Sequence, residues 1–318
     1  MTSRDLTIGM IFLSQTAVGI LGNFSLLCHY LSFHFTGCRV RSTDLILKHL
    51  TIANLLAILS KGIPQTMAAL GVEDFLNDTG CKLVFYVHRV SRDVSLGTTC
   101  LLNIFQAIMI SPRTSRCAEL AVKAPKFIGT SIIFCWVLNM TVNIIVLVYV
   151  AGKDGITDKN DYGYCSAALH EKTVGTLYVT LVLFHDGFCL VLILWASGST
   201  VFILLGHKQQ VQHIYRNRVS PRSSPETRAT QSILVLVSTF VCLCMVSSIL
   251  HVCLATLRNP SWWLVNLSAL IAAGFPTVSP YVLMSHDPTV SRPCFAWIRN
   301  TKSPKHIINI NSMCIHSG

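Results

Sequence analysis

The chain has 318 residues and is strongly apolar. Only 12% of its residues are charged, 52% are hydrophobic, and the mean hydropathy is +0.55. A water-soluble domain usually carries about twice that share of charge. The composition therefore excludes an ordinary soluble domain and favours a chain embedded in lipid.

The formal net charge is +11, which raises the question of a nucleic-acid partner. However, the basic residues stand in short runs between apolar segments and do not gather on one polar face. Membrane topology explains this distribution, so we expect membrane lipid and no nucleic acid as a partner.

Seven segments are long and apolar enough to cross a bilayer, since a spanning helix needs roughly 20 mostly apolar residues. They are residues 7–33, 45–70, 82–111, 127–150, 176–206, 232–257 and 262–284. The predicted fold class is all-α, an integral membrane bundle of seven transmembrane helices. We expect one receptor-like domain over residues 1–284 and a cytoplasmic tail over residues 285–318.

The distribution of Lys and Arg predicts the orientation, because positive residues are retained on the cytoplasmic side. With the amino end outside, the inner segments carry about 15 of them and the outer segments about 5. We therefore predict an extracellular amino end.

Charged and polar residues also occur inside the predicted spans, toward the outer side. They are Lys61 in the second span, Arg89, Arg92 and Asp93 in the third, and His185 and Asp186 in the fifth. Charge at that depth is costly unless it is paired or wetted. One interpretation is an internal ion pair between Arg89 and Asp93, which are four residues apart. The other is a pocket, open to the outside, in which these residues bind a polar or anionic group of a small ligand.

Two further features lie on the predicted outer side. Cys81 stands at the outer end of the third span and Cys165 lies in the longest outer loop, which permits a disulfide that pins the loop over the bundle. The alternative is two unpaired loop cysteines. Asn77 opens an Asn-Asp-Thr sequon in an outer loop and is a candidate glycosylation site.

The sequence offers no catalytic or metal-binding motif. It contains no nucleophile arrangement, zinc-ligand spacing or phosphate-cradling glycine loop. We therefore expect no enzyme activity, no cofactor and no metal.

Several stretches resemble known receptors. Gly22-Asn23, the stretch 49–54 and the Cys81 to Cys165 spacing resemble the rhodopsin-like receptor plan, without its usual acidic-Arg-aromatic and Asn-Pro-x-x-Tyr sequences. The stretches STDLILKHLTIANLLAILSKG, HRVSRD, TTCLLNIFQAIMISPR, HDGFCLVLILWASG, SPRSSPETRATQS and FPTVSPYVLM together resemble the vomeronasal type-1 pheromone receptors. The resemblance covers residues 20–284.

This resemblance implies a chemosensory receptor in the plasma membrane that senses small organic cues. It also implies coupling to a heterotrimeric G protein of the inhibitory class. The basic residues of the inner loops would face that protein: Arg113, Arg116, Arg216, Arg218 and Arg228. Their alternative role is to fix topology by binding anionic lipid headgroups.

Two other hypotheses compete with a signalling receptor. A small-molecule transporter would usually show repeated halves and broken helices at mid-membrane, and the sequence indicates neither. A seven-helix protein of receptor ancestry that no longer signals would keep the fold and lose the response to ligand.

Overall fold

The computed structural model describes residues 3–35, 42–72, 75–111, 115–151, 160–161, 166–169, 172–214 and 261–286, with the positions 235, 238, 239, 241–243, 245–247, 249 and 250. Helices dominate this part of the chain. Six of them are long and apolar enough to cross a membrane. They correspond to six of the seven predicted spans. The predicted span 232–257 lies largely outside the described residues, and its described positions are helical.

The first span is α1 (Ser3–Phe35) and the third is α4 (Asp78–Ile110). The second span is one continuous helical segment that consists of α2 (Ser42–Ala57), η1 (Ile58–Gly62) and α3 (Ile63–Ala69). The segment η1 is a π-turn, and Pro64 follows it. A proline lacks the backbone N–H and its ring clashes with the carbonyl four residues earlier, here that of Ser60. The wider π-turn is a known accommodation inside α-helices.

The fourth span differs from the sequence prediction. We predicted one helix over 127–150, whereas the structure has α5 (Ser115–Val142), a break at Asn143 and the short α6 (Ile144–Tyr149). The carbonyl of Asn139 accepts from both the backbone N–H of Asn143 at 3.1 Å and its side-chain Nδ2 at 3.0 Å. Hydropathy detects apolar length and does not detect a local break of this kind.

The fifth span is α7 (Lys172–Ile214), which extends beyond the predicted 176–206 at both ends because a helix can continue into polar residues outside the lipid. The last span consists of α9 (Trp262–Ala272) and α10 (Gly274–His286). They meet at Ala273, ahead of Pro276, whose ring removes a hydrogen bond to the carbonyl of Ala272.

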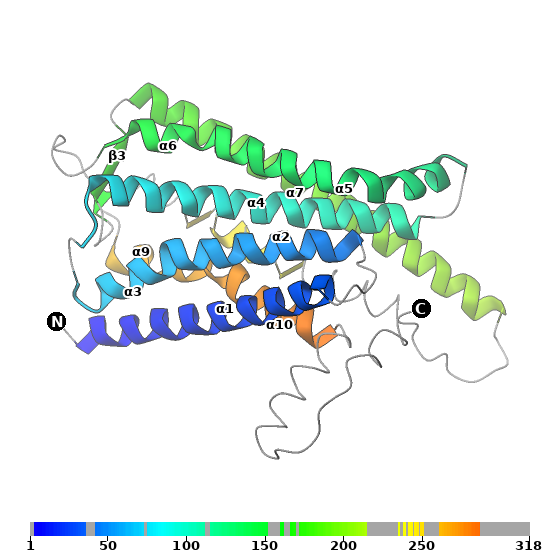
Figure 1. Ribbon diagram of the computed structural model, residues 1–318, viewed down its shortest axis with the longest axis horizontal. Helices are drawn as coiled ribbons and strands as arrows, with labels where there is room; N and C mark the ends of the chain where they lie inside the picture. The colour runs from blue at the N-terminus through cyan, green and yellow to red at the C-terminus, as the bar shows by residue number, and fades with distance from the viewer. Residues whose placement is uncertain are drawn as a thin grey trace, which may run out of the picture.

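The loop after α6 contains a small antiparallel sheet that the all-α prediction missed. Its strands are β1 (Val150–Ala151), β2 (Asn160–Asp161) and β3 (Ser166–Leu169), in the order β1-β3-β2. Strands of two to four residues are too short to give an alternating pattern. In Figure 1 the sheet, α6 and the amino end of α1 lie at the same end of the bundle.

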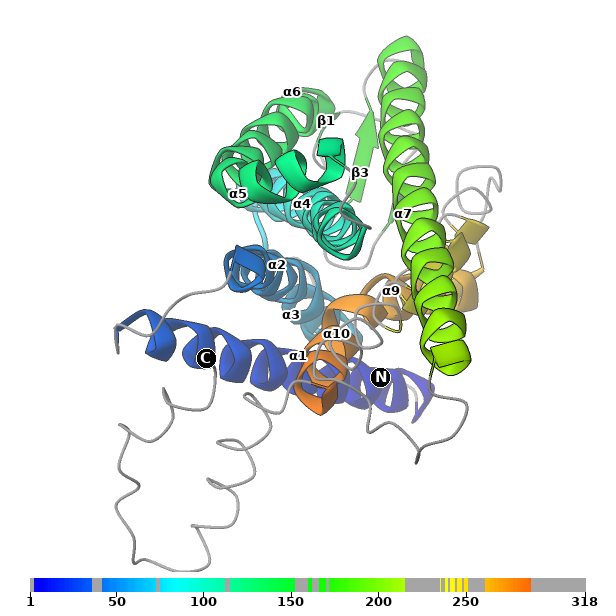
Figure 2. The same cartoon turned by 90° about the vertical axis from the view of Figure 1, so that its right-hand side faces the viewer.

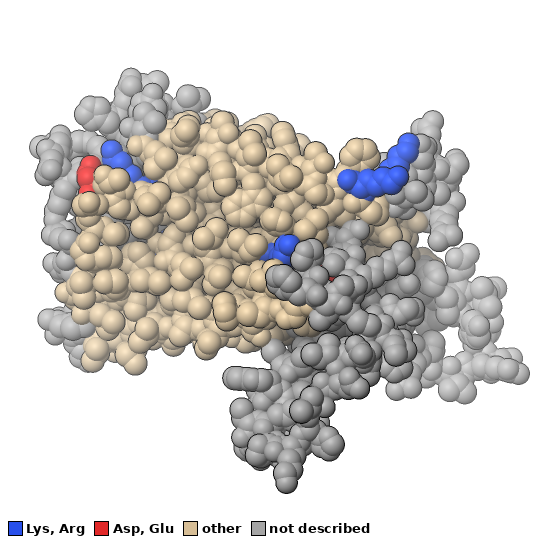
Figure 3. Space-filling view, viewed as in Figure 1, with Lys and Arg blue, Asp and Glu red and all other residues tan. Residues whose placement is uncertain are grey.

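The helix α4 lies at the centre of the bundle. It packs against α2, η1, α5, α6 and α7, and Figure 2, turned by 90°, shows it surrounded by α2, α5 and α7. Leu102, Val94, Ser91 and Thr98 on this helix are completely or almost completely buried. The outer surface shown in Figure 3 carries few charged side chains, and most of them lie toward the two ends of the bundle. That distribution suits a belt of lipid around the middle.

The seam between α1 and α10 depends on a glycine. A Cβ atom on Gly22 would lie 2.8 Å from the Pro280 ring and 2.9 Å from the Tyr281 ring. The Tyr281 hydroxyl donates to the carbonyl of Val18 at 2.8 Å, and Asn23 Nδ2 donates to the carbonyl of Pro276 at 2.8 Å. Close approach of the two backbones is what permits these hydrogen bonds between helices.

We predict that Gly22→Ala destabilises the bundle, because two rigid rings would have to move and the seam would open. The expected loss is about 1–3 kcal/mol, seen as a lower apparent Tm of the purified protein. The matched control is Gly129→Ala, since nothing lies within 4 Å of a Cβ atom there. An equal change in both variants would contradict the close packing at Gly22.

Candidate functional site

One face of α4 presents polar groups to the interior of the bundle. His88, Arg92 and Ser95 are spaced four and three residues apart, so they share a face of the helix. The first turn of α4 is capped: Asn77 is the N-cap residue, and the Asn77 side chain accepts a hydrogen bond from Gly80 N at 2.8 Å. At 1.5 Å per residue, His88 lies about 15 Å along the helix from Asp78.

An ion pair joins this face to α7. Arg92 Nη2 donates to Asp186 Oδ2 at 2.7 Å, and the two side chains are only 21% and 10% exposed. His185 Nδ1 lies 3.5 Å from Asp186 Oδ1, and its Nε2 lies 4.0 Å from Cys189 Sγ. Arg92, His185 and Asp186 were all predicted site residues, and the structure brings them together.

Asp93 faces a different neighbour. It is only 3% exposed, and Asn143 Nδ2 donates to its Oδ2 at 2.9 Å. Tyr86 lies seven residues, or about two helical turns, before Asp93 and so on the same side of α4. Its hydroxyl donates to the carbonyl of Met140 at 3.1 Å. Asp93 therefore lies on the side of α4 that packs against the fourth span. The charges are paired as Arg92 with Asp186, in place of the Arg89–Asp93 pair that the spacing permitted.

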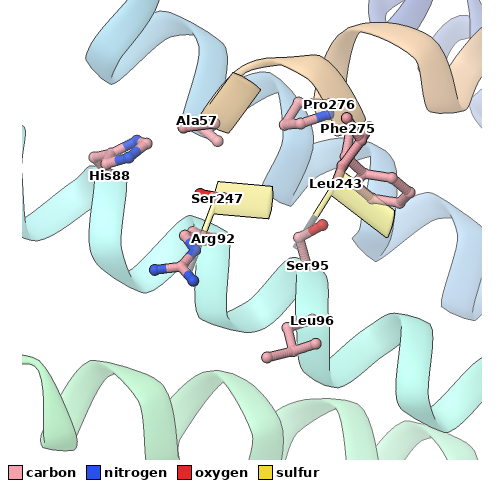
Figure 4. A pocket seen from close by; sticks show the side chains of 10 residues that line it. Ala57, His88, Arg92, Ser95, Leu96, Leu243, Ser247, Phe275 and Pro276 are labelled. Atoms are coloured by element: carbon pink, nitrogen blue, oxygen red, sulfur yellow. The ribbon is translucent and has the colours of Figure 1, made fainter. Parts of the chain in front are cut away.

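A cavity lies beside the face of α4 that carries His88, Arg92 and Ser95, between four spans. It is lined by His88, Arg92, Ser95 and Leu96 of α4, Ala57 of α2, Leu243 and Ser247 of the sixth span, Ala272 of α9, and Phe275 and Pro276 of α10. Figure 4 shows the His88 and Arg92 side chains on its α4 wall with Ala57 and Phe275 across from them. Its volume is about 40 Å³. That is room for one or two water molecules, whereas pockets that hold drug-sized ligands measure about 300–1,000 Å³.

Ser95, one of the residues that line the cavity, belongs to a hydrogen-bonded network between three helices. Ser95 Oγ donates to Asn54 Oδ1 at 2.7 Å, and Asn54 Nδ2 donates to Ser279 Oγ at 2.9 Å. All three residues are buried. Ser95 thus contacts both the cavity and a network that reaches α10 next to Pro280.

Lys61 and Arg89 lie near the cavity without lining it. Lys61 is in the π-turn η1 and is within electrostatic range of Arg89 and Arg92. Both side chains are partly buried. The positive field of these residues therefore extends over the α4 wall of the cavity.

Sequence reasoning missed His88. Its side chain lines the cavity together with Ala57 of α2. The available signal was its spacing of four residues from Arg92 within HRVSRD, which puts both on one face.

The remaining predicted site residues lie at or beyond the edge of the described part of the chain. Cys81 is disulfide-bonded, while Cys165 lies outside the described residues. Asn77 is exposed, as an acceptor for a glycan must be. Arg116 lies in the first turn of α5, and Arg113, Arg216, Arg218 and Arg228 are outside the described residues. Among the residues that the structure describes, no cluster of three His, Cys, Asp or Glu has the arrangement of a metal site.

Comparison with known proteins identifies the family. The model of the vomeronasal organ pheromone receptor family matches residues 6–296. The chain belongs to this family. It is 59% identical to vomeronasal type-1 receptor 4 of Homo sapiens over 302 residues, covering 94% of this chain and 100% of that receptor.

Other relatives agree. Vomeronasal type-1 receptor 3 of Homo sapiens is 56% identical over 310 residues, covering 96% of this chain and 99% of the relative. Vomeronasal type-1 receptor 45 of Mus musculus is 34% identical over 311 residues, covering 94% and 89%. Membership in this receptor family confirms the resemblance, the multi-pass membrane fold and the prediction that the chain is not an enzyme.

We predict that the Arg92–Asp186 pair shows strong coupling in a double-mutant cycle. Arg92→Met or Asp186→Leu alone leaves one charge buried without its partner, at a cost of about 3 kcal/mol. The double variant Arg92→Met/Asp186→Leu removes both charges and should recover most of the loss. The stabilities of the unaltered receptor, the two single variants and the double variant are compared by thermal unfolding of the purified proteins. Additive losses would mean that the two side chains do not act as a pair.

Proposed function

We propose that this vomeronasal-family receptor binds a small organic ligand in the cavity beside α4 and activates a heterotrimeric G protein of the inhibitory class. It would lie in the plasma membrane with the amino end extracellular and residues 285–318 as a cytoplasmic tail. The proposal rests above all on the cavity lined by Arg92 and His88 among apolar side chains.

The lining favours a ligand with an apolar body and an oxygen-bearing group. Leu96, Leu243 and Phe275 offer apolar contacts, and Arg92 offers a guanidinium. Lys61 and Arg89 add positive potential, which favours a partly or fully anionic oxygen. Asp186 already compensates Arg92, so such a ligand would share or replace the Arg92–Asp186 bond.

The small volume suggests how binding and activation are linked. A ligand larger than two waters requires the walls to separate, and the walls belong to four different spans. A ligand activates only if it binds the active arrangement better than the resting one. The free energy of binding would then drive α4 and α7 apart at the Arg92–Asp186 pair, or displace the Ser95–Asn54–Ser279 network.

Several predictions from the sequence complete the proposal. A Cys81–Cys165 disulfide would hold the loop that carries β3 over the outer end of α4, because Cys165 directly precedes Ser166. Asn77 would carry a glycan. Arg113, Arg116, Arg216, Arg218 and Arg228 would face the G protein from the inner side.

The test is a ligand panel in cells that report activation of inhibitory G proteins. The panel contains apolar carboxylates and sulfonates together with their neutral methyl esters. We expect the receptor to respond to acids more strongly than to esters. The Arg92→Met/Asp186→Leu variant should reach the surface and lose about 10- to 100-fold in potency toward the acids, as expected for a charged hydrogen bond.

The matched control is Leu83→Ala, an exposed position on the same helix that does not line the cavity. Its potency should equal that of the unaltered receptor. An unaltered receptor that is silent toward the whole panel, or a double variant that keeps full potency for acids, would contradict the proposal.

A further inference from the structure

The cavity contains a buried nitrogen that the protein does not satisfy. His88 Nδ1 is buried and has no hydrogen-bond partner. Its side chain lines the cavity, and Figure 4 shows the ring beside the space between α4 and Ala57. Buried polar atoms without a partner are uncommon in native proteins, and each calls for an explanation such as a bound molecule.

The ring lies next to the second span. His88 and Ala57 line the same cavity, and the Ala57 backbone is close enough to act on the His88 ring. Ala57 is the residue that leads into the π-turn η1, and its carbonyl accepts a hydrogen bond from Ser60 Oγ at 3.3 Å. The His88 ring therefore lies where α4 faces the start of the π-turn.

The tautomer of the ring decides the chemistry of Nδ1. In a neutral ring that carries its proton on Nε2, Nδ1 is an acceptor. The neighbouring polar groups have different roles. Arg92 is a donor that is bonded to Asp186, and Ser95 donates to Asn54.

We propose that His88 Nδ1 accepts a hydrogen bond from a hydroxyl or N–H group of the ligand and so determines ligand specificity. This inference rests on the proposed function, since it adds a requirement to the ligand of the same cavity. His88 and Arg92 are four residues apart, about 6 Å along α4. The receptor should therefore favour compact molecules that carry a hydrogen-bond donor at one end and an oxygen acceptor at the other.

The experiment uses a matched pair of probes, 4-hydroxybenzoate and 4-methoxybenzoate. Both carry a carboxylate across one benzene ring from an oxygen, and only the first has a donor at that oxygen. Binding is measured on the full-length purified receptor in lipid nanodiscs. We expect the hydroxyl probe to bind about five- to tenfold more tightly than the methoxy probe, as expected for one hydrogen bond.

Three variants separate recognition from structure. His88→Ala should bring the ratio of the two affinities to about one, because the acceptor is gone. His88→Asn should restore the preference, since an Asn oxygen can occupy the Nδ1 position and accept. Leu83→Ala, exposed on the same helix, should keep the ratio of the unaltered receptor.

Equal affinities of the two probes in the unaltered receptor would overturn the inference, and so would an unchanged ratio in His88→Ala. Failure of the hydroxyl probe to bind at all would also overturn it. The proposed function fails separately, through silence of the receptor toward the whole panel of acids and esters. A receptor that responds to that panel without any preference for hydroxyl-bearing molecules would keep the function and lose this inference.

Discussion

The hydrocarbon of a bilayer offers no hydrogen-bond partners, and this constraint shapes the whole bundle. Every polar side chain within a span must find its partner inside the bundle or in its own helix. Most polar side chains of the described spans meet this constraint in one of two ways, while six buried side-chain atoms, His88 Nδ1 and Asp93 Oδ1 among them, have no partner. Thr51, Thr66 and Thr99 donate to carbonyls four residues earlier in their own helices. Asn23 and Asn54 instead connect different helices, and both are almost completely buried.

The same constraint gives α4 two distinct polar faces. Toward the fourth span, Tyr86 and Asp93 are bonded to Met140 and Asn143, which fixes the position of α4 in the bundle. Toward the cavity, Arg92 is held by Asp186 while His88 retains an unsatisfied nitrogen. Asp93 Oδ1 has no hydrogen-bond partner either, but Asp93 does not line the cavity, whereas an unsatisfied nitrogen on a cavity wall suits a binding surface. A ligand would complete the second face, and this is the physical basis of the proposed function.

Much of the fold follows from the sequence because the spanning requirement is a property of composition and length. Six predicted spans are found as helices, and the displaced boundaries lie where polar residues continue a helix beyond the lipid. The breaks were harder to predict. Pro64 and Pro276 indicate interruptions, but neither a π-turn at Ile58–Gly62 nor the break at Asn143 follows from apolar length, because both are local changes of backbone geometry inside an apolar run.

The site was only partly predictable for a geometric reason. Depth along a helix follows from the rise per residue, so Arg92, His185 and Asp186 were expected at one level, and they do meet there. Rotation of a helix about its axis does not follow from depth. For that reason the sequence left the partner of Asp93 open, and the spacing of His88 from Arg92 could not show that their common face borders a cavity. The packed bundle assigns Asp93 to Asn143 and places His88 on the cavity wall.

A receptor for external cues must take up its ligand from outside the cell, so the α4 cavity should be reachable from the outer side of the membrane. Reaction of cysteine variants with a small, anionic, membrane-impermeant thiol reagent tests this access. Ala57→Cys lines the cavity, whereas Leu59→Cys, two residues away, is exposed on the outside of the bundle where lipid would cover it. We predict that Ala57→Cys reacts above the background of the unaltered receptor when the reagent is applied to intact cells, and that Leu59→Cys does not. Reaction of Ala57→Cys only after the inner side is exposed, or on neither side, would contradict a ligand cavity that opens outward.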